Sequence, residues 1–216
     1  MLYYSQKLLE HEYAKDLAKR LMATGDWVDG LVSAKGSGVK RNIQLGPEQH
    51  SKFSSEVIKL LENNENIRYS VFPKKIHSLL FTRTGSGMFY GPHVDLPHVP
   101  QGRRDLSFTL FLSEKDSYKG GELILYIPPE KKVIKLNPGE MIMYPTKYLH
   151  EVKEVTEGER MVCVGWIESQ IARDEDRESL HLMKSAINDL MKQVGITQAT
   201  QSLNISFNNI YKRFLN

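Results

Sequence analysis

The hydrophobic period changes twice along the chain. Near the N-terminus, apolar residues recur about every four positions, which is typical of an amphipathic helix. A first helix is predicted over residues 6–23, with Gly25 beyond its end, and a second is predicted to open at Pro47. Their predicted core faces are Leu9, Tyr13, Leu17 and Leu21 in the first helix, and Phe53, Val57, Leu60 and Leu61 in the second.

From about residue 75 the period becomes two, which is the period of a β-strand. In LSFTLFLS (106–113), an apolar face alternates with a mixed face: Leu106, Phe108, Leu110 and Leu112 against Ser107, Thr109, Phe111 and Ser113. Gly, Pro and Asn residues between such segments mark turns. The other predicted strands are 75–84, 88–95, 120–128, 132–136, 140–145, 149–155 and 160–169. Short strands at this spacing, without helices between them, predict an antiparallel sandwich or jelly roll.

After Ser169 the helical period returns in two stripes, and the first of them ends at Gly195. They are Leu180, Met183, Ile187, Leu190 and Val194, then Leu203, Phe207, Ile210 and Phe214. These helices are expected to pack against the sheet, and they could also form a homodimer interface. The predicted class is α+β, with a helical support region over 1–74, a β domain over 75–169 and a helical extension over 170–216.

Composition and charge narrow the class of protein. A chain of 216 residues, 40% hydrophobic and 25% charged, is typical of a globular domain with a real core. The net charge of +3, without a long basic run, predicts no nucleic-acid partner. No signal peptide is recognisable and no run approaches the roughly 20 apolar residues of a membrane span. The single cysteine, Cys163, excludes an internal disulfide. We therefore expect a cytoplasmic protein with no membrane partner.

The segment GPHVDLPH (91–98) raises the question of a metal site. In a strand, His93 and Asp95 point to the same side about 6.5 Å apart, so both can reach one ion. The best third ligand is His150 in YPTKYLHEV, because a jelly roll brings distant strands side by side. Two histidines and one carboxylate on one face of an ion are the ligand set of non-haem Fe(II) oxygenases, which leaves three positions open.

A His-x-Asp pair alone is most often a surface pair or a structural hydrogen bond. Here Gly91 and Pro92 constrain the approach to it, and Tyr90 stands just ahead. Arg160 follows His150 by ten residues, and a hairpin turn at TEGE (156–159) would return it into the same cavity. A forked, permanently charged guanidinium is suited to hold a carboxylate in one pose.

On these residues the whole chain resembles the bacterial PKHD-type hydroxylases, which are Fe(II)- and 2-oxoglutarate-dependent dioxygenases related to prolyl 4-hydroxylases. The resemblance runs from the first helix to the C-terminal helices. The matching stretches are DWVDG (26–30), FTRTGSGMFYGPHVD (81–95), RRDLSFTLFLS (103–113), YKGGEL (118–123), MYPTKYLHEV (143–152), TEGERMV (156–162) and GWIESQIARDEDRESL (165–180).

The resemblance implies a double-stranded β-helix core, a form of jelly roll. It implies that His93, Asp95 and His150 bind iron, and that Arg160 binds the far carboxylate of 2-oxoglutarate. The expected reaction uses O2 and couples the oxidative decarboxylation of 2-oxoglutarate, giving succinate and CO2, to hydroxylation of a peptidyl or small-molecule substrate. Ascorbate would keep the iron reduced.

The chain departs from the family at two positions. Related members carry tyrosine where this sequence has Thr84, and in the wider group that tyrosine helps to hold the cosubstrate. Tyr90 or Tyr144 could substitute for it. The family often has asparagine after the His-x-Asp pair, where this chain has Leu96, so its substrate could differ.

Two other functions fit the same ligands. One is a non-catalytic, cupin-like metal- or ligand-binding module, which would not need Arg160. The other is a zinc hydrolase, because His2Asp sets can hold zinc with one open site.

Several further residues are interpreted without a role in catalysis. His98, Arg103 and Arg104 are expected to be loop residues, and contact with an acidic or peptide substrate is the second interpretation for the two arginines. Cys163 and Trp166 are expected to lie in the core.

Overall fold

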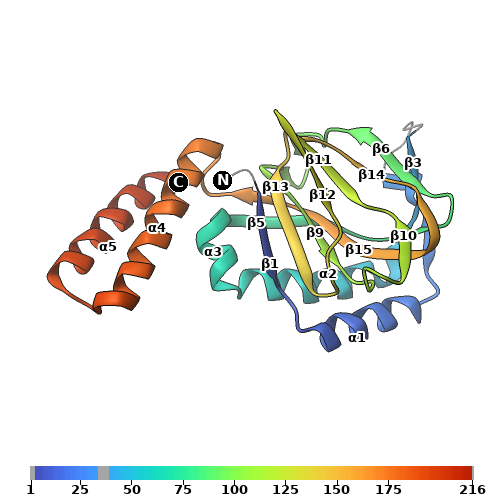
Figure 1. Cartoon of the computed structure of the whole chain (residues 1–216), viewed down its shortest axis with the longest axis horizontal. Helices are drawn as coiled ribbons and strands as arrows, with labels where there is room; N and C mark the ends of the chain where they lie inside the picture. Colours follow the sequence, from blue (N-terminus) through green and yellow to red (C-terminus); the bar gives the residue numbers. More distant parts are fainter. Residues whose placement is uncertain (1–2, 34–38, 216) are drawn as a thin grey trace.

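The computed structural model describes residues 3–33 and 39–215, and within them the strands form two main sheets that face each other (Figure 1). The larger sheet has the order β1-β13-β9-β15-β5-β4-β2, with β10 paired to β15. Its strands are β1 (Tyr4–Lys7), β13 (Glu140–Pro145), β9 (Leu106–Phe111), β15 (Val155–Ser169), β5 (Pro73–Gly85), β4 (Ile43–Leu45), β2 (Trp27–Asp29) and β10 (Tyr118–Gly120).

The smaller sheet has the order β12-β11-β14-β6-β3, and its pairs are antiparallel. Its strands are β12 (Glu130–Ile134), β11 (Leu123–Ile127), β14 (Leu149–Val152), β6 (Phe89–His93) and β3 (Lys40–Arg41). A separate ribbon of β7 (His98–Val99) and β8 (Gly102–Arg103) follows β6. This arrangement confirms the predicted jelly roll of α+β class.

The alternation predicted for residues 106–113 is confirmed, and it separates the core from the site. Leu106, Phe108, Leu110 and Leu112 join the main hydrophobic cluster with the buried faces of two helices, α1 (His11–Met22) and α2 (Pro47–Glu62), which cover one face of the larger sheet (Figure 1). Between the sheets lies a second cluster that includes Phe111, Ile142 and Val162. Ser107 and Thr109 point away from the helices and line a pocket between the sheets.

The N-terminal region differs from its prediction because it also contributes strands. Residues 4–7 form β1 and pair with β13, so the first helix begins at His11 rather than at residue 6. Tyr13, which we placed in the core, is 40% exposed and donates a hydrogen bond to Glu56. A 3-10 turn, η1 (Gly30–Ser33), and α3 (Glu65–Val71) were also not predicted.

The predicted hairpin turn at TEGE is wrong. Residues 156–159 lie inside β15, a single strand that continues to Ser169, while β14 ends at Val152 in the other sheet. The chain therefore crosses between sheets at residues 153–154 instead of reversing within one. The predicted strand 120–128 is likewise divided, because Gly120 at the end of β10 and Gly121 after it adopt positive φ and turn the chain before β11 begins.

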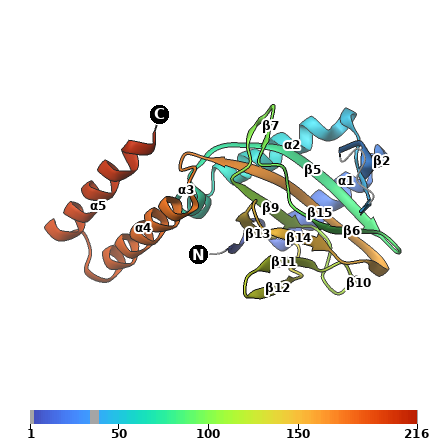
Figure 2. The ribbon, with the colours of Figure 1, turned by 90° about the horizontal axis from the view of Figure 1, so that it is seen from above.

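The C-terminal helices α4 (Asp174–Val194) and α5 (Gln198–Tyr211) form a hairpin that extends away from the sheets (Figures 1 and 2), followed by the short η2 (Lys212–Phe214). The hairpin packs on α3 and on itself through a third hydrophobic cluster: Phe72, Ile171, Leu180, Ile187 and Phe207. It does not lie across the sheet as we expected, and Met183, Val194 and Leu203 are exposed. The homodimer stays a prediction. None of the helices in the described residues has the length and apolar character needed to cross a bilayer.

Candidate metal centre and active-site pocket

A pocket of about 610 Å³ opens between the two sheets. This volume is within the usual range for small-molecule sites. The proposed ligands and cosubstrate residues all line it: Tyr90, His93, Asp95, Tyr144, His150 and Arg160. Thr84 and Leu96 line it too.

The three predicted metal ligands converge in this pocket. His93 ends β6 and His150 lies directly opposite it in β14, so strand pairing alone brings the two rings together, with centroids 4.2 Å apart. Asp95 follows β6 by two residues. Its carboxylate oxygens lie 3.7 Å from His93 Nε2 and 3.8 Å from His150 Nε2.

The candidate ligand atoms lie within 4.8 Å of one another. A single ion with bonds of about 2.0–2.2 Å can lie between them after small side-chain movements.

Backbone carbonyls orient both imidazoles. His93 Nδ1 lies 2.8 Å from the Gly91 carbonyl oxygen, and His150 Nδ1 lies 3.0 Å from that of Tyr148. When each Nδ1 donates its proton to the carbonyl, each Nε2 carries a free lone pair toward the centre. Metal-binding histidines are commonly held in this way. Burial, and next the neighbouring His150 ring, lower the pKa of His93 to about 4. His93 is therefore neutral at physiological pH, which is the form that binds metals.

The Asp95 carboxylate is held by two donors from the larger sheet. Ser107 Oγ and Trp166 Nε1 donate to Oδ2 over 2.8 Å and 2.9 Å. Ser107 and Trp166 are paired residues of β9 and β15, so one register places both donors beside the carboxylate. Trp166 is buried, as we expected, and its indole also orients a candidate ligand. Sequence reasoning could not find this contact because it depends on the register of two strands distant in the chain.

Arg160 lies in the pocket although the turn predicted to bring it there is absent. Its side chain is 2% exposed, and its Nε has no hydrogen-bond partner. No carboxylate of the described residues lies within 4.0 Å of its guanidinium. Burial lowers the pKa of Arg160, but a guanidinium stays charged in proteins. A buried cation with no close carboxylate among the described residues fits a carboxylate ligand.

Thr84, where this chain departs from the family pattern, lies directly beside Arg160, because the two residues are paired across β5 and β15. Two tyrosines lie near the triad instead. The Tyr90 ring stacks on His93 with centroids 3.6 Å apart, and the Tyr144 ring meets His150 edge-on at 5.4 Å. Burial raises the pKa of both phenols, so both remain protonated and able to donate a hydrogen bond.

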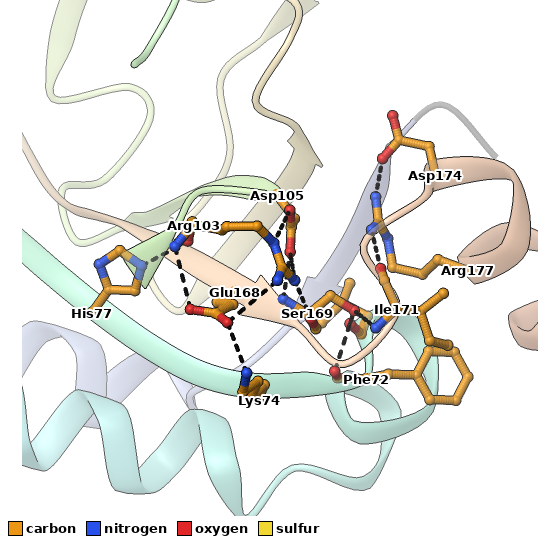
Figure 3. Close-up of polar contacts among 11 residues, drawn as sticks. Phe72, Lys74, His77, Arg103, Asp105, Glu168, Ser169, Ile171, Asp174 and Arg177 are labelled. Atoms are coloured by element: carbon orange, nitrogen blue, oxygen red, sulfur yellow. Dashed lines mark hydrogen bonds and ion pairs between the residues drawn. The ribbon is translucent and has the colours of Figure 1, made fainter. Parts of the chain in front are cut away.

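The ribbon that follows Asp95 is anchored by a polar network (Figure 3). Arg103 pairs with Asp105 over 2.9 Å, and its backbone N–H donates to Glu168 over 3.2 Å. His77 Nε2 contacts the Arg103 carbonyl oxygen at 2.9 Å. Gly102 has φ +149°, and a Cβ there would lie 2.5 Å from Glu168 Oε2, so a larger residue would displace this carboxylate. The Arg103 side chain is thus 39% exposed but held in place by structural contacts.

Arg104 points the other way, into the pocket, with its guanidinium carbon 3.7 Å from the centroid of the Trp166 ring. The solvated-loop reading of Arg104 is therefore wrong. His98 is exposed in β7 and is not among the described residues that line the pocket, as the plainer reading expected. Lys40 lines the pocket as well, and sequence reasoning gave no signal for it.

The jelly roll and the His-Asp-His group together define the class of protein as a non-haem iron oxygenase, and the comparisons agree. Residues 79–168 match the 2OG-Fe(II) oxygenase superfamily. A PKHD-type hydroxylase of Prochlorococcus marinus (strain MIT 9301) is 39% identical over 98% of both chains, and another from strain MIT 9515 is 38% identical over the same shares. The chain belongs to the PKHD-type hydroxylase family.

Solved structures support the fold. A prolyl-4-hydroxylase of Pseudomonas putida matches with a TM-score of 0.57 at 18% identity, covering 77% of this chain and 92% of that one. A prolyl hydroxylase of Trichoplax adhaerens, in complex with a hypoxia inducible factor peptide fragment, matches with a TM-score of 0.55 at 18% identity, covering 82% and 86%.

The protein is a 2-oxoglutarate-dependent dioxygenase that uses Fe(II) and O2, and its His93, Asp95 and His150 fit the iron site. Family membership favours this function over the cupin-like module and the zinc hydrolase.

Proposed function

We propose that His93, Asp95 and His150 hold the ferrous ion, that Arg160 binds the C5 carboxylate of 2-oxoglutarate, and that the enzyme hydroxylates a C–H bond of a peptidyl or small-molecule substrate. One observation carries the proposal. Three prospective ligand side chains, two of them with Nε2 directed inward, converge beside a buried guanidinium that has no carboxylate partner among the described residues.

Iron and 2-oxoglutarate would supply the oxidising power, by reducing O2 as 2-oxoglutarate is decarboxylated to succinate. The residues of the chain would position and isolate this chemistry. The carbonyls of Gly91 and Tyr148 keep both imidazoles in the binding tautomer, and Ser107 and Trp166 restrain Asp95. We further propose that the Tyr90 and Tyr144 hydroxyls contact the cosubstrate in place of the tyrosine that Thr84 replaces.

The substrate is proposed from kinship. Relatives are named PKHD-type hydroxylases, and fold neighbours include prolyl hydroxylases, so peptidyl proline is one candidate. A small metabolite is the other, and the exposed Leu96 beside the pocket supports a substrate different from that of its relatives. We also propose that ascorbate sustains turnover by keeping the iron reduced, which adding and omitting ascorbate during repeated turnover will test.

The direct test is anaerobic. Metal-free protein mixed with Fe(II) and 2-oxoglutarate should develop the visible charge-transfer band of the iron chelate, and admission of O2 should release succinate. In Arg160→Met the affinity for 2-oxoglutarate should fall at least about tenfold, because a charge-assisted carboxylate contact is lost. The affinity for Mn(II) alone, measured by titration, should be retained.

The matched control is Arg173→Met, which removes an exposed arginine at the start of α4 and should leave both affinities unchanged. Absence of the band and of succinate in the folded wild type would overturn the assignment. Unchanged 2-oxoglutarate affinity in Arg160→Met would overturn the role of Arg160 while leaving the iron ligands intact.

We propose a cytoplasmic location, supported by the single cysteine, Cys163, which is buried and free. Cell fractionation against a compartment marker will test this, and recovery with a secreted marker would contradict it.

A further inference from the structure

Lys40 is a buried cation on the wall of the pocket. It is 5% exposed, and its Nζ donates to Ser33 Oγ over 2.7 Å and lies 5.4 Å from the centroid of the Tyr90 ring. No carboxylate of the described residues lies within 4.0 Å of this ammonium. Burial lowers the pKa of Lys40 to about 8, which shows how costly the charge is in this place. A buried lysine without a counter-ion is uncommon and is a mark of functional sites.

Arg104 is a second cation that has no counter-ion in the described part of the chain. Its guanidinium stacks on Trp166, its Nε is buried without a hydrogen-bond partner, and no carboxylate of the described residues lies within 4.0 Å. The network around Arg103 in Figure 3 fixes the backbone one residue away and thereby holds Arg104 toward the pocket. The side chain is therefore placed with unused donors facing the cavity.

The charges of the pocket do not balance. Histidines aside, the charged side chains that line it in the described residues are Lys40, Arg104, Arg160 and Asp95. A ferrous ion and the 2-oxoglutarate dianion carry equal and opposite charge, so their binding leaves this surplus of cations unchanged. Arg160 would be neutralised by the cosubstrate, and Asp95 by the metal. Lys40 and Arg104 then remain as two positive charges in the pocket, which favours an additional anionic ligand.

These two cations belong to a different part of the pocket from Arg160. Trp166, which supports Arg104, lies six residues beyond Arg160 on β15, or about 20 Å along an extended strand. Lys40 lies on β3, opposite Tyr90 of β6.

We propose that the substrate carries a carboxylate, and that Lys40 and Arg104 bind this group so that a C–H bond of the same molecule faces the iron centre. The inference rests on the proposed function, since it names the substrate class of the same site. A carboxylate carries a charge opposite to that of both cations, and its two oxygens can accept from an ammonium as well as from a forked guanidinium.

The test uses fractions of an extract from the organism that makes the protein, added to the iron-loaded enzyme with 2-oxoglutarate and O2. The extract is separated on an anion exchanger into a retained and an unretained fraction. Part of the retained fraction is treated with carbodiimide and ammonia, which converts carboxylates to amides and leaves phosphates charged. We expect the retained fraction to raise succinate release above the rate without extract, and amidation to abolish the increase. Passing each fraction through a filter distinguishes small acids from peptides.

The variants are Lys40→Met and Arg104→Met, with Lys40→Arg as the charge-retaining variant. Relative to each variant's own rate without extract, the two methionine variants should need about tenfold more retained fraction for half-maximal stimulation, because each loses a charge-assisted contact. Lys40→Arg should need less than Lys40→Met. Lys59→Met and Arg173→Met change exposed cations outside the pocket and should match the wild type.

Each alternative result has a definite meaning. Stimulation by the unretained fraction, stimulation that survives amidation, or wild-type behaviour of both methionine variants would overturn the carboxylate proposal. So would the absence of any stimulation by the retained fraction while the enzyme still forms succinate. A wild-type enzyme that forms no succinate from 2-oxoglutarate under any condition would instead overturn the function on which the inference rests.

Discussion

At the scale of single residues, the two oxygens of Asp95 have different surroundings. Oδ2 accepts hydrogen bonds from Ser107 and Trp166, whereas Oδ1 accepts none from the side chains of the described residues and lies 3.7 Å from His93 Nε2. The carboxylate is thus restrained from one side before any metal binds. Ligands restrained by outer partners bind metals more tightly, because less motion is lost on binding.

We therefore expect Trp166→Phe to weaken metal binding. The substitution keeps an aromatic ring under Arg104 but removes the Nε1 donor to Asp95. The dissociation constant for Mn(II), measured by titration of the metal-free protein, should rise by roughly 10–100-fold. Trp27→Phe is the matched control, since Trp27 lies on β2 and its indole nitrogen has no hydrogen-bond partner. Equal affinities for the wild type and Trp166→Phe would show that this donor does not restrain the carboxylate.

Lys40 should reduce stability while it serves binding. Its ammonium is buried with one hydroxyl contact and no counter-ion among the described residues, which is an unfavourable environment for a charge. In the absence of ligands, Lys40→Met should increase the free energy of unfolding in urea by about 1 kcal/mol. Lys59→Met, on the exposed side of α2, should change it by less than about 0.5 kcal/mol. A clear loss of stability in Lys40→Met would show that the Ser33 contact outweighs the cost of burial.

At the scale of elements, the ribbon of β7 and β8 depends on the end of β15. Glu168 accepts from the Arg103 backbone and pairs with Lys74 over 3.2 Å. Burial alone would raise the pKa of Glu168, but its contacts with Lys74 and Arg103 outweigh burial and lower it. A carboxyl whose pKa is lowered by folding stabilises the protein above its unfolded pKa, and this contribution is lost as the pH falls through its folded pKa.

Glu168→Gln should consequently destabilise the protein in a pH-dependent way. At pH 7 the loss should be about 1–3 kcal/mol, because two cationic partners and a backbone donor lose a charged acceptor. The difference from the wild type should shrink as the pH falls below about 4.5, the ordinary value for this carboxyl. Urea unfolding at a series of pH values measures the loss of stability at pH 7 and its decrease at lower pH. Glu62→Gln, an exposed carboxylate on α2, serves as control. A difference that stays constant with pH would show that charge is not what matters at Glu168.

The elements differ in how far sequence predicts them, and the reason is physical. Strand β9 was predicted because its two faces meet different environments, a helix-covered core and a polar pocket, so its residues alternate. Strands β2, β3 and β4 are two or three residues long, which is too short to show a period, and their pairing with longer strands creates them. The first residues of β15 are polar because they are exposed, so TEGE looked like a turn.

The residues of the site also differ in how far the sequence predicts them. His93, Asp95, His150 and Arg160 were predicted because their chemistry is rare and their spacing resembles that of a family. Ser107, Trp166 and Lys40 carry no local signal, since a serine or tryptophan in a strand, or a lysine in a polar segment, has many ordinary explanations. Their roles follow from sheet register and burial, which arise only when the whole chain has folded.

At the scale of the molecule, the hydrophobic interior is divided into three clusters, and the third belongs to the C-terminal hairpin. Phe207 is 1% exposed there, and its ring lies 6.4 Å from that of Phe72 and 6.0 Å from that of Tyr211. The two clusters of the jelly roll share none of these residues. A structure divided in this way should open in parts, because each cluster stabilises mainly the elements that contribute to it.

Phe207→Ala should therefore loosen the hairpin and leave the sheets intact. Truncation of a buried phenylalanine costs about 3–5 kcal/mol, and Phe207 packs only within the cluster that holds the hairpin. Amide hydrogen exchange should accelerate strongly in α4 and α5 and remain slow in β9 and β15, and binding of 2-oxoglutarate to the iron-loaded enzyme should persist. Leu110→Ala, in the main cluster, should instead accelerate exchange in the sheets. If Phe207→Ala accelerated amide exchange in β9 as much as in α5, the hairpin and the jelly roll would form one cooperative unit. The three clusters would then not stabilise separate parts of the molecule.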